Sequence, residues 1–103
     1  MNVDATAWPL LDALHDVLDP ETGVNLVDLG LVYDVRFDPA TGAAVVVMTL
    51  TTPACPAGDV MLEGAERRLL LVPGVRSVEV QLTFEPRWTV ERITEEGKRQ
   101  LGW

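Results

Sequence analysis

The residue best suited to metal or nucleophilic chemistry is the single cysteine, Cys55. It stands in the stretch Thr-Thr-Pro-Ala-Cys-Pro at residues 51–56, after an apolar run and before a run with helical spacing. A thiol at the first turn of a helix lies near unpaired backbone N–H groups and the positive end of the helix dipole. Both favour the thiolate, which attacks carbon or binds a metal. Cys55 is therefore the first candidate for a site, although a lone cysteine is also a common small core residue.

A second set of polar residues precedes it, in the loop over 19–25, where Asp19 and Glu21 flank Pro20. If this loop and the loop over 51–58 converge at one end of a sheet, two carboxylates meet the thiol. Their negative charge disfavours a free thiolate, whereas a bound cation reverses that balance, so the combination suits a metal better than a bare nucleophile. Asp-Pro sequences also form turns for local reasons, which remains the alternative for Asp19.

The elements that must position these residues follow from hydrophobic periodicity and from end signals. Pro9 suits a first helical turn, Pro20 ends a helix at Asp19, and Thr94 can cap a short helix that stops at Gly102. Alternating apolar residues predict strands, and spacings of three and four predict helices. In chain order we expect a helix over 9–19, strands over 31–37 and 43–50, a helix over 58–72, a strand over 77–84 and a short helix over 94–102.

This order predicts an α+β fold, a two-layer sandwich of the order α-β-β-α-β with a short C-terminal helix over a three-stranded mixed sheet. The length of 103 residues suits one domain, 1–103. The strand over 43–50 is apolar at nearly every position, although one face of such a sheet should be open. We therefore expect a homodimer, or the C-terminal segment, to cover that face.

Composition excludes several classes of partner. Sixteen acidic against eight basic residues give a formal net charge of -8, which repels nucleic acid and anionic membrane surfaces. No apolar stretch approaches the roughly 20 residues needed to span a bilayer, and the first residues do not resemble a secretory leader. A single cysteine also fits a reducing compartment, so we expect a cytoplasmic protein.

Several short motifs occur in an order that resembles the metal-sulfur cluster biosynthesis family of SufT and PaaD. They are Val-Leu-Asp-Pro-Glu at 17–21, Val-Asp-Leu-Gly-Leu-Val-Tyr at 27–33, Met-Thr-Leu-Thr-Thr-Pro-Ala-Cys-Pro at 48–56, Pro-Gly-Val at 73–75, Trp-Thr at 88–89 and Gly-Lys-Arg-Gln-Leu-Gly at 97–102. The resemblance spans the chain from about residue 10 onward. It implies a fold like that of other iron-sulfur cluster assembly domains.

The same resemblance implies an accessory or carrier factor in the maturation of iron-sulfur proteins, with an assembly scaffold or client apoproteins as partners. The family's functional positions correspond to Asp19, Glu21, Thr51, Thr52 and Cys55 in this chain. Two positions depart from the family pattern: Thr22 replaces an aliphatic residue and Arg87 replaces a proline. The chain also ends at Trp103 without the cysteine-bearing extension expected of PaaD, so a SufT-like general role is favoured.

The number of thiols limits what the site can hold. A cluster takes about four protein ligands, mostly thiolates, and this chain supplies one. A transient iron-sulfur cluster, or iron, would therefore be shared between two copies of the chain or with a partner or small thiol; in a third arrangement there is no cluster, only recognition of a client. We expect Cys55 to be the ligand, Asp19 and Glu21 to shape the site, and Thr51 and Thr52 to donate hydrogen bonds.

Two other classes of function remain open. Cys55 could be the nucleophile of an enzyme, but the sequence shows no nucleophile elbow and no second cysteine, and its single histidine, His15, lies on the polar face of the first predicted helix. The chain could instead be a structural interaction module that binds partners through Trp8, Trp88 and Trp103. We expect a protein that is not an enzyme.

Overall fold

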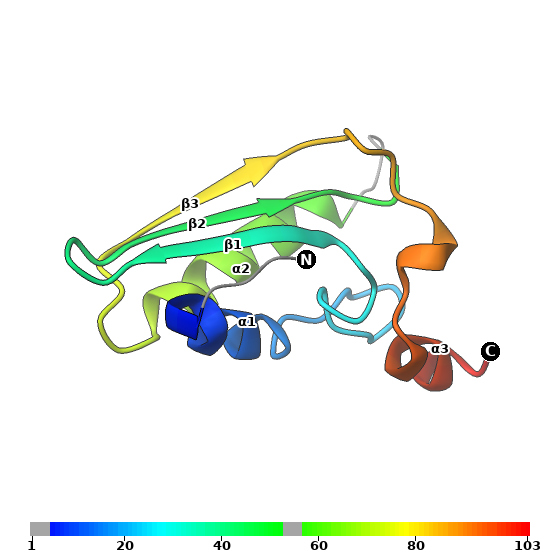
Figure 1. Cartoon of the computed structure of the whole chain (residues 1–103). Helices are drawn as coiled ribbons and strands as arrows, with labels where there is room; N and C mark the ends of the chain where they lie inside the picture. The colour runs from blue at the N-terminus through cyan, green and yellow to red at the C-terminus, as the bar shows by residue number, and fades with distance from the viewer. Residues whose placement is uncertain (1–4, 53–56) are drawn as a thin grey trace.

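The computed structural model describes residues 5–52 and 57–103. A sheet forms one layer, and helices cover one of its faces (Figure 1). The elements are η1 (Ala5–Ala7), α1 (Trp8–Leu14), β1 (Val32–Asp38), β2 (Ala43–Met48), α2 (Gly58–Leu70), β3 (Ser77–Leu82), η2 (Val90–Arg92) and α3 (Glu95–Leu101). The predicted two-layer α+β order is confirmed.

The sheet has the strand order β1-β2-β3, with β2 in the centre. β1 and β2 are antiparallel and joined by a tight turn, whereas β2 and β3 are parallel and joined by α2. The sheet is therefore three-stranded and mixed, as the sequence predicts. Since β2 and β3 run in the same direction, the segments that follow them, from Thr49 and from Thr83, leave the same end of the sheet (Figure 1).

A single hydrophobic core fills the space between the two layers. Alternate residues of β2, namely Ala44, Val46 and Met48, point into it and meet Met61 and Leu69 of α2. The alternation along β2 and the helical spacing along α2 each place one apolar face toward the other element. This core fixes the end of β2 and the beginning of α2, between which the Cys55 segment runs.

The first helix is shorter than the sequence predicts. The expectation of a helix over 9–19 is wrong, because α1 ends at Leu14. Beyond it the chain turns, and Leu18 pairs with Asn25 in an isolated antiparallel bridge while the Leu26 N–H donates to the carbonyl of Val17 at 3.0 Å. This pairing satisfies backbone groups that a longer helix would have used, and it leaves Leu18 exposed rather than in the core.

β1 contains a bulge that changes which side chains face inward. Val32 is opposite Met48 but Asp34 is opposite Val47, so Tyr33 is the extra residue. The sequence predicts inward-facing Leu31, Tyr33, Val35 and Phe37; Tyr33 instead donates its hydroxyl to the carbonyl of Pro86 at 2.7 Å. A bulge re-aims one side chain at a sheet edge. Here it links β1 to the segment that follows β3.

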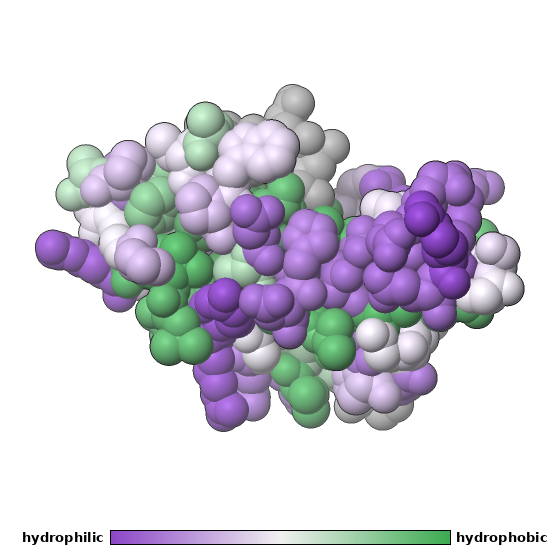
Figure 2. Space-filling model, turned by 90° about the horizontal axis from the view of Figure 1, so that it is seen from below, coloured by the Kyte–Doolittle hydropathy of each residue, from purple (hydrophilic) through white to green (hydrophobic). Residues whose placement is uncertain are grey.

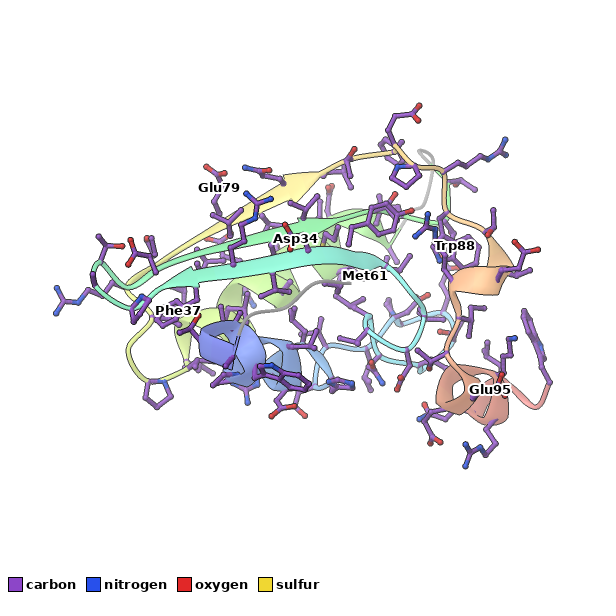
Figure 3. All side chains as sticks on the ribbon, viewed as in Figure 1. Asp34, Phe37, Met61, Glu79, Trp88 and Glu95 are labelled. Carbon is purple, nitrogen blue, oxygen red and sulfur yellow. The ribbon has the colours of Figure 1, made fainter. Side chains whose placement is uncertain are left out.

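The open face of the sheet is more polar than the sequence of β2 suggests. Val45 and Val47 lie on this face half-buried, opposite Arg36 and Asp34 of β1 and beside Glu79 and Gln81 of β3. Arg36 and Asp34 form an ion pair at 2.7 Å, and Glu79 points away from the helices (Figure 3). Long polar side chains from the edge strands therefore flank the central valines, which reduces the need for a second subunit there.

The C-terminal segment does not lie over this face as a covering tail; it packs beyond the end of the sheet (Figure 1). The Thr94 hydroxyl donates to the Asp28 carboxylate at 2.8 Å, and it accepts a hydrogen bond from the Gly97 N–H at 3.0 Å as the predicted cap of α3. Asn25 Nδ2 donates to the other Asp28 oxygen at 2.7 Å. This network joins α3 to the loop before β1.

Among the described residues, no helix is long and apolar enough to cross a membrane.

Candidate functional site

A pocket lies at the end of the sheet where β2 and β3 finish. It has a volume of about 340 Å³ and is lined by Leu50, Thr51, Thr52, Phe84, Glu85, Arg87 and Trp88. Both threonines are exposed, so their hydroxyls are available to a ligand. The structure thus places the two predicted threonines together in one pocket. The other lining residues include the aromatic Phe84 and Trp88 and the charged Glu85 and Arg87.

The pocket adjoins the beginning of α2. Leu50 lines it and also packs against Gly58, where a Cβ atom would lie only 2.7 Å from the Leu50 Cδ1 atom. Ala57 and Gly58 are buried. Cys55 lies outside the described residues, but the segment 53–56 connects Thr52 in the pocket to Ala57 at the helix start. The nearest buried residues on either side of the cysteine segment are therefore Leu50 before it and Ala57 after it.

Trp88 is held in place by its own hydrogen bond. Its indole Nε1 donates to the backbone carbonyl of Leu29 at 2.8 Å, and the side chain packs against the core (Figure 3). With the polar edge of the ring occupied by Leu29, the rest of the ring is free to form pocket wall. The bulge contact between Tyr33 and Pro86 fixes the same segment a few residues earlier.

Asp19 and Glu21 do not line this pocket. Asp19 is buried and holds a local turn: its Oδ1 accepts the Glu21 N–H at 2.9 Å, and its carbonyl accepts the Gly23 N–H at 2.8 Å. Glu21 is exposed on that turn. Asp19 therefore forms the local turn that its Asp-Pro sequence predicts.

The chain that leads to Asp19 runs along α2 toward its first turn. Arg68, near the end of α2, pairs with Asp16 at 3.0 Å. Val17 approaches Gly64 at the middle of the helix, and Leu18 shares a groove with Val60 of the first turn. Asp19 is the next residue along this direction. This direction is compatible with convergence of the two loops, which the sequence leaves open.

No group of three or more His, Cys, Asp or Glu side chains within 5–52 and 57–103 is arranged to hold a metal ion. His15 is exposed at the end of α1, as predicted, and its Nδ1 bonds to the carbonyl of Leu11 at 3.0 Å. His15 is the C-cap residue of α1, and it does not line the pocket. The described part of the chain offers the pocket apolar walls, the hydroxyls of Thr51 and Thr52, and the charged residues Glu85 and Arg87.

Comparison with known families decides the classification. A family model described as "Iron-sulfur cluster assembly protein" matches residues 9–82, which is most of the chain. The chain belongs to this family. The match spans all three strands and α2, and thus both β2 and α2, which border the cysteine segment. It confirms the resemblance seen in the short motifs.

Relatives of this family member cover nearly its whole length. An "Fe-S protein maturation auxiliary factor" of Porphyromonas gingivalis is 44% identical over 98 residues, 95% of this chain and 92% of the relative. The auxiliary factor SufT of Staphylococcus aureus is 37% identical over 84% of this chain and 97% of its own. An "Iron-sulfur cluster carrier protein" of Synechocystis is 40% identical over 78% of this chain but only 22% of that protein.

A solved structure confirms the fold of this family member. The crystal structure of a domain of unknown function from Bacillus anthracis superposes with a TM-score of 0.90 at 38% identity, over 95% of this chain and 92% of that one. The two-layer arrangement with its mixed sheet is therefore also that of this solved domain. Relatives bear the names of auxiliary factors or carriers and not of enzymes.

Sequence reasoning missed part of the pocket of this family member. Phe84 was expected to continue the last strand, but β3 ends at Leu82, which frees Phe84 to line the pocket. The sequence motifs include Trp88, with Arg87 directly before it, but do not predict that either residue lines the site. The signal was present in Pro86, which cannot donate to a sheet ladder and so favours an end to the strand before it.

Proposed function

We propose that this chain is an accessory factor in iron-sulfur protein maturation that handles iron or a cluster as transient cargo through Cys55. One observation carries the proposal: the segment containing the only cysteine joins a pocket wall, at Thr52, to the buried start of α2. The residues directly before the segment, Thr51 and Thr52, carry exposed hydroxyls on the pocket wall, and the residues directly after it are buried. The membership of the family and the names of its relatives support the role.

Cargo on this chain must be shared with another molecule. One thiolate supplies about a quarter of the ligands that a cluster requires, so the remaining ligands come from a second copy, a partner protein or a small thiol. The larger carrier protein of Synechocystis, whose name refers to cluster carriage, contains a region related to this chain. Shared ligation keeps the cargo exchangeable, which is what delivery to an apoprotein needs.

The other predicted site residues have distinct parts in this proposal. Thr51 and Thr52 would donate hydrogen bonds to cargo sulfur, since both are exposed on the pocket wall. Asp19 and Glu21 would shape the opposite side of the site, with Asp19 fixing the turn that presents Glu21. The pocket lined by the two threonines, Phe84 and Trp88 would receive an apolar side chain of a scaffold or client apoprotein. We place this activity in the cytoplasm and assign it no catalytic step.

Anaerobic reconstitution with iron and sulfide tests the proposal. The parent chain should acquire visible charge-transfer absorption and bound iron and sulfide in native mass spectra. Cys55→Ser should lose both. A matched control moves the thiol: Cys55→Ser combined with Ser77→Cys keeps one cysteine, now on the exposed start of β3. We expect this control to remain without cargo, because its thiol is far along the sheet from the pocket.

Two results would contradict the proposal. Unchanged cargo in the Cys55→Ser variant would show that other groups bind it. Equal cargo in the relocated-thiol control would show that any exposed thiol suffices. Either result would leave client recognition, without cargo, as the function to examine.

A further inference from the structure

The outward face of α2 carries large apolar side chains in open water. Val60, Gly64, Arg67 and Leu71 follow one another at spacings of four, three and four residues, which places them on one stripe of the helix. Val60 is 60% exposed and Leu71 is 75% exposed. Together with Leu18 they border a groove of about 380 Å³ on the helical side of the molecule, where Figure 2 shows apolar side chains between hydrophilic ones. Such a patch marks a contact surface.

Gly64 leaves the middle of this stripe without a side chain. A Cβ atom at Gly64 would meet only Val17 Cγ1, at 3.2 Å. Val17 of the same chain thus lies close against the glycine, and the absent side chain leaves a shallow hollow beside Val17, between the apolar ends formed by Val60 and Leu71. The stripe has the outline of a helix-packing surface, with a hollow at its centre and a knob near each end.

The charges along α2 are partly separated by sign. Asp59 and Glu63 lie in the first half of the helix, and the second half carries Glu66 followed by Arg67 and Arg68. Arg68 pairs with Asp16, but Glu63 and Arg67 take no part in the three ion pairs of the described residues. A second α2 running in the opposite direction would set Glu63 against a cation and Arg67 against an anion. A parallel partner would set like charges together.

We propose that this surface binds a second copy of the chain, with the two α2 helices antiparallel about a two-fold axis near residues 65 and 66. In that arrangement Val60 packs against the partner's Leu71, and Gly64 receives the stem of the partner's Arg67. The guanidinium of the partner's Arg67 reaches Glu63, and symmetry repeats each contact. The pattern is self-complementary in both shape and charge, and this selects a copy of the chain over an unrelated helix. The proposal does not depend on the cargo.

The size of the surface makes the dimer weak. Stable interfaces bury about 800 Å² per partner, and a pair of 13-residue helices with one flanking loop offers less. We expect a monomer-dimer equilibrium that is observable at micromolar to millimolar protein concentration. This mode differs from a dimer through the open sheet face, which the polar side chains of β1 and β3 disfavour.

The dimer also separates the two cargo sites. Gly58 lies between seven and eight residues from the axis, so the two Gly58 residues are about 22 Å apart at a rise of about 1.5 Å per residue. Each pocket then stands at its own end of the dimer. In such a dimer, cargo is shared more easily with a scaffold, client or small thiol than between the two copies.

Sedimentation equilibrium over a concentration series tests the interface. Glu63→Arg alone and Arg67→Glu alone each place like charges opposite one another twice, and we expect the dissociation constant to rise about tenfold or more. A mixture of the two single variants pairs opposite charges again and should associate like the parent. The double variant Glu63→Arg with Arg67→Glu keeps the net charge of -8 and should also dimerise. Glu95→Arg on α3 serves as the control for net charge.

Both positions are exposed, so the variants should fold, and circular dichroism checks this. A parent chain that stays monomeric up to about 1 mM would overturn the proposal, since that limit corresponds to a negligible contact. A dimer that the single variants leave unchanged would also overturn it. So would a failure of the mixture to restore association, because only the antiparallel pairing of Glu63 with Arg67 predicts that rescue.

Discussion

At the residue scale, Asp19 combines a structural contact with a candidate site position. Its Oδ1 accepts the Glu21 N–H, and a carboxamide oxygen can accept the same bond. The two roles therefore separate by substitution. Asp19→Asn keeps the turn and removes the charge, whereas Asp19→Ala removes both.

We expect Asp19→Asn to keep the free energy of unfolding within about 0.5 kcal/mol of the parent and to lower the iron retained after reconstitution. Asp19→Ala should lose about 1 kcal/mol as well, since the Glu21 N–H loses its partner. Urea unfolding and iron analysis give the two readouts. Parent-like iron in the Asn variant would show that Asp19 only holds the turn. Glu21→Gln, on an exposed side chain, tests the charge of the second carboxylate of the proposed site separately.

Gly30 shows how one backbone position joins two distant segments. Its φ is +73°, and a Cβ atom there would overlap the carbonyl oxygen of Arg92. Gly23 has nearly the same φ, +74°, with nothing within 4 Å of a Cβ atom. The pair separates conformational strain from steric overlap.

We expect Gly23→Ala to cost about 1–2 kcal/mol, from the left-handed conformation alone. Gly30→Ala should cost at least about 2 kcal/mol more, because the η2 backbone must move away. Urea unfolding of both variants measures the difference. Equal losses of unfolding free energy in the two variants would mean that the backbone around Arg92 moves aside at no cost in free energy.

At the element scale, periodicity predicted the sheet and α2 better than α1. The strands and α2 bury one regular face each, so their patterns survive in the fold. Val17 and Leu18 continue the helical spacing of α1, but their backbones pair with 25–26 instead, a long-range choice that no local pattern contains. The site residues divide in the same way. A local motif predicts Thr51 and Thr52, whereas Phe84 and Trp88 line the pocket only because of the path that the chain takes after β3.

α3 depends on Thr94 for both its start and its attachment. The hydroxyl of Thr94 caps the Gly97 N–H and donates to the Asp28 carboxylate. Thr94→Val keeps the shape and removes both bonds, which should cost about 2 kcal/mol and leave the Asp28 oxygen short of a donor. Hydrogen exchange should then speed up at Gly97 and Lys98 while the β2 amides change little. Thr94→Ser should behave like the parent. Unchanged exchange at Gly97 in the valine variant would show that the cap contributes nothing.

At the scale of the whole molecule, the C-terminal segment raises the question of what constitutes the domain. The family match ends at residue 82, yet several hydrogen bonds tie later residues to earlier ones, among them Tyr33 to Pro86, Trp88 to Leu29 and Thr94 to Asp28. Trp88 and Leu101 also pack against the core. These contacts predict that 83–103 unfolds together with the sheet, as one domain.

A single fluorescent reporter tests this. Trp8 and Trp103 are 55% and 69% exposed, so replacing both with Phe should change stability little and leave Trp88 as the only tryptophan. We expect the Trp88 fluorescence and the far-ultraviolet circular dichroism to follow the same urea transition, with an m value of about 1–3 kcal/mol per molar urea. Their coincidence follows from the indole hydrogen bond, which cannot survive once the loop before β1 opens. A fluorescence transition at lower urea would instead make 83–103 an appendage that detaches first, and the pocket would then lose its aromatic wall while the sheet stays folded.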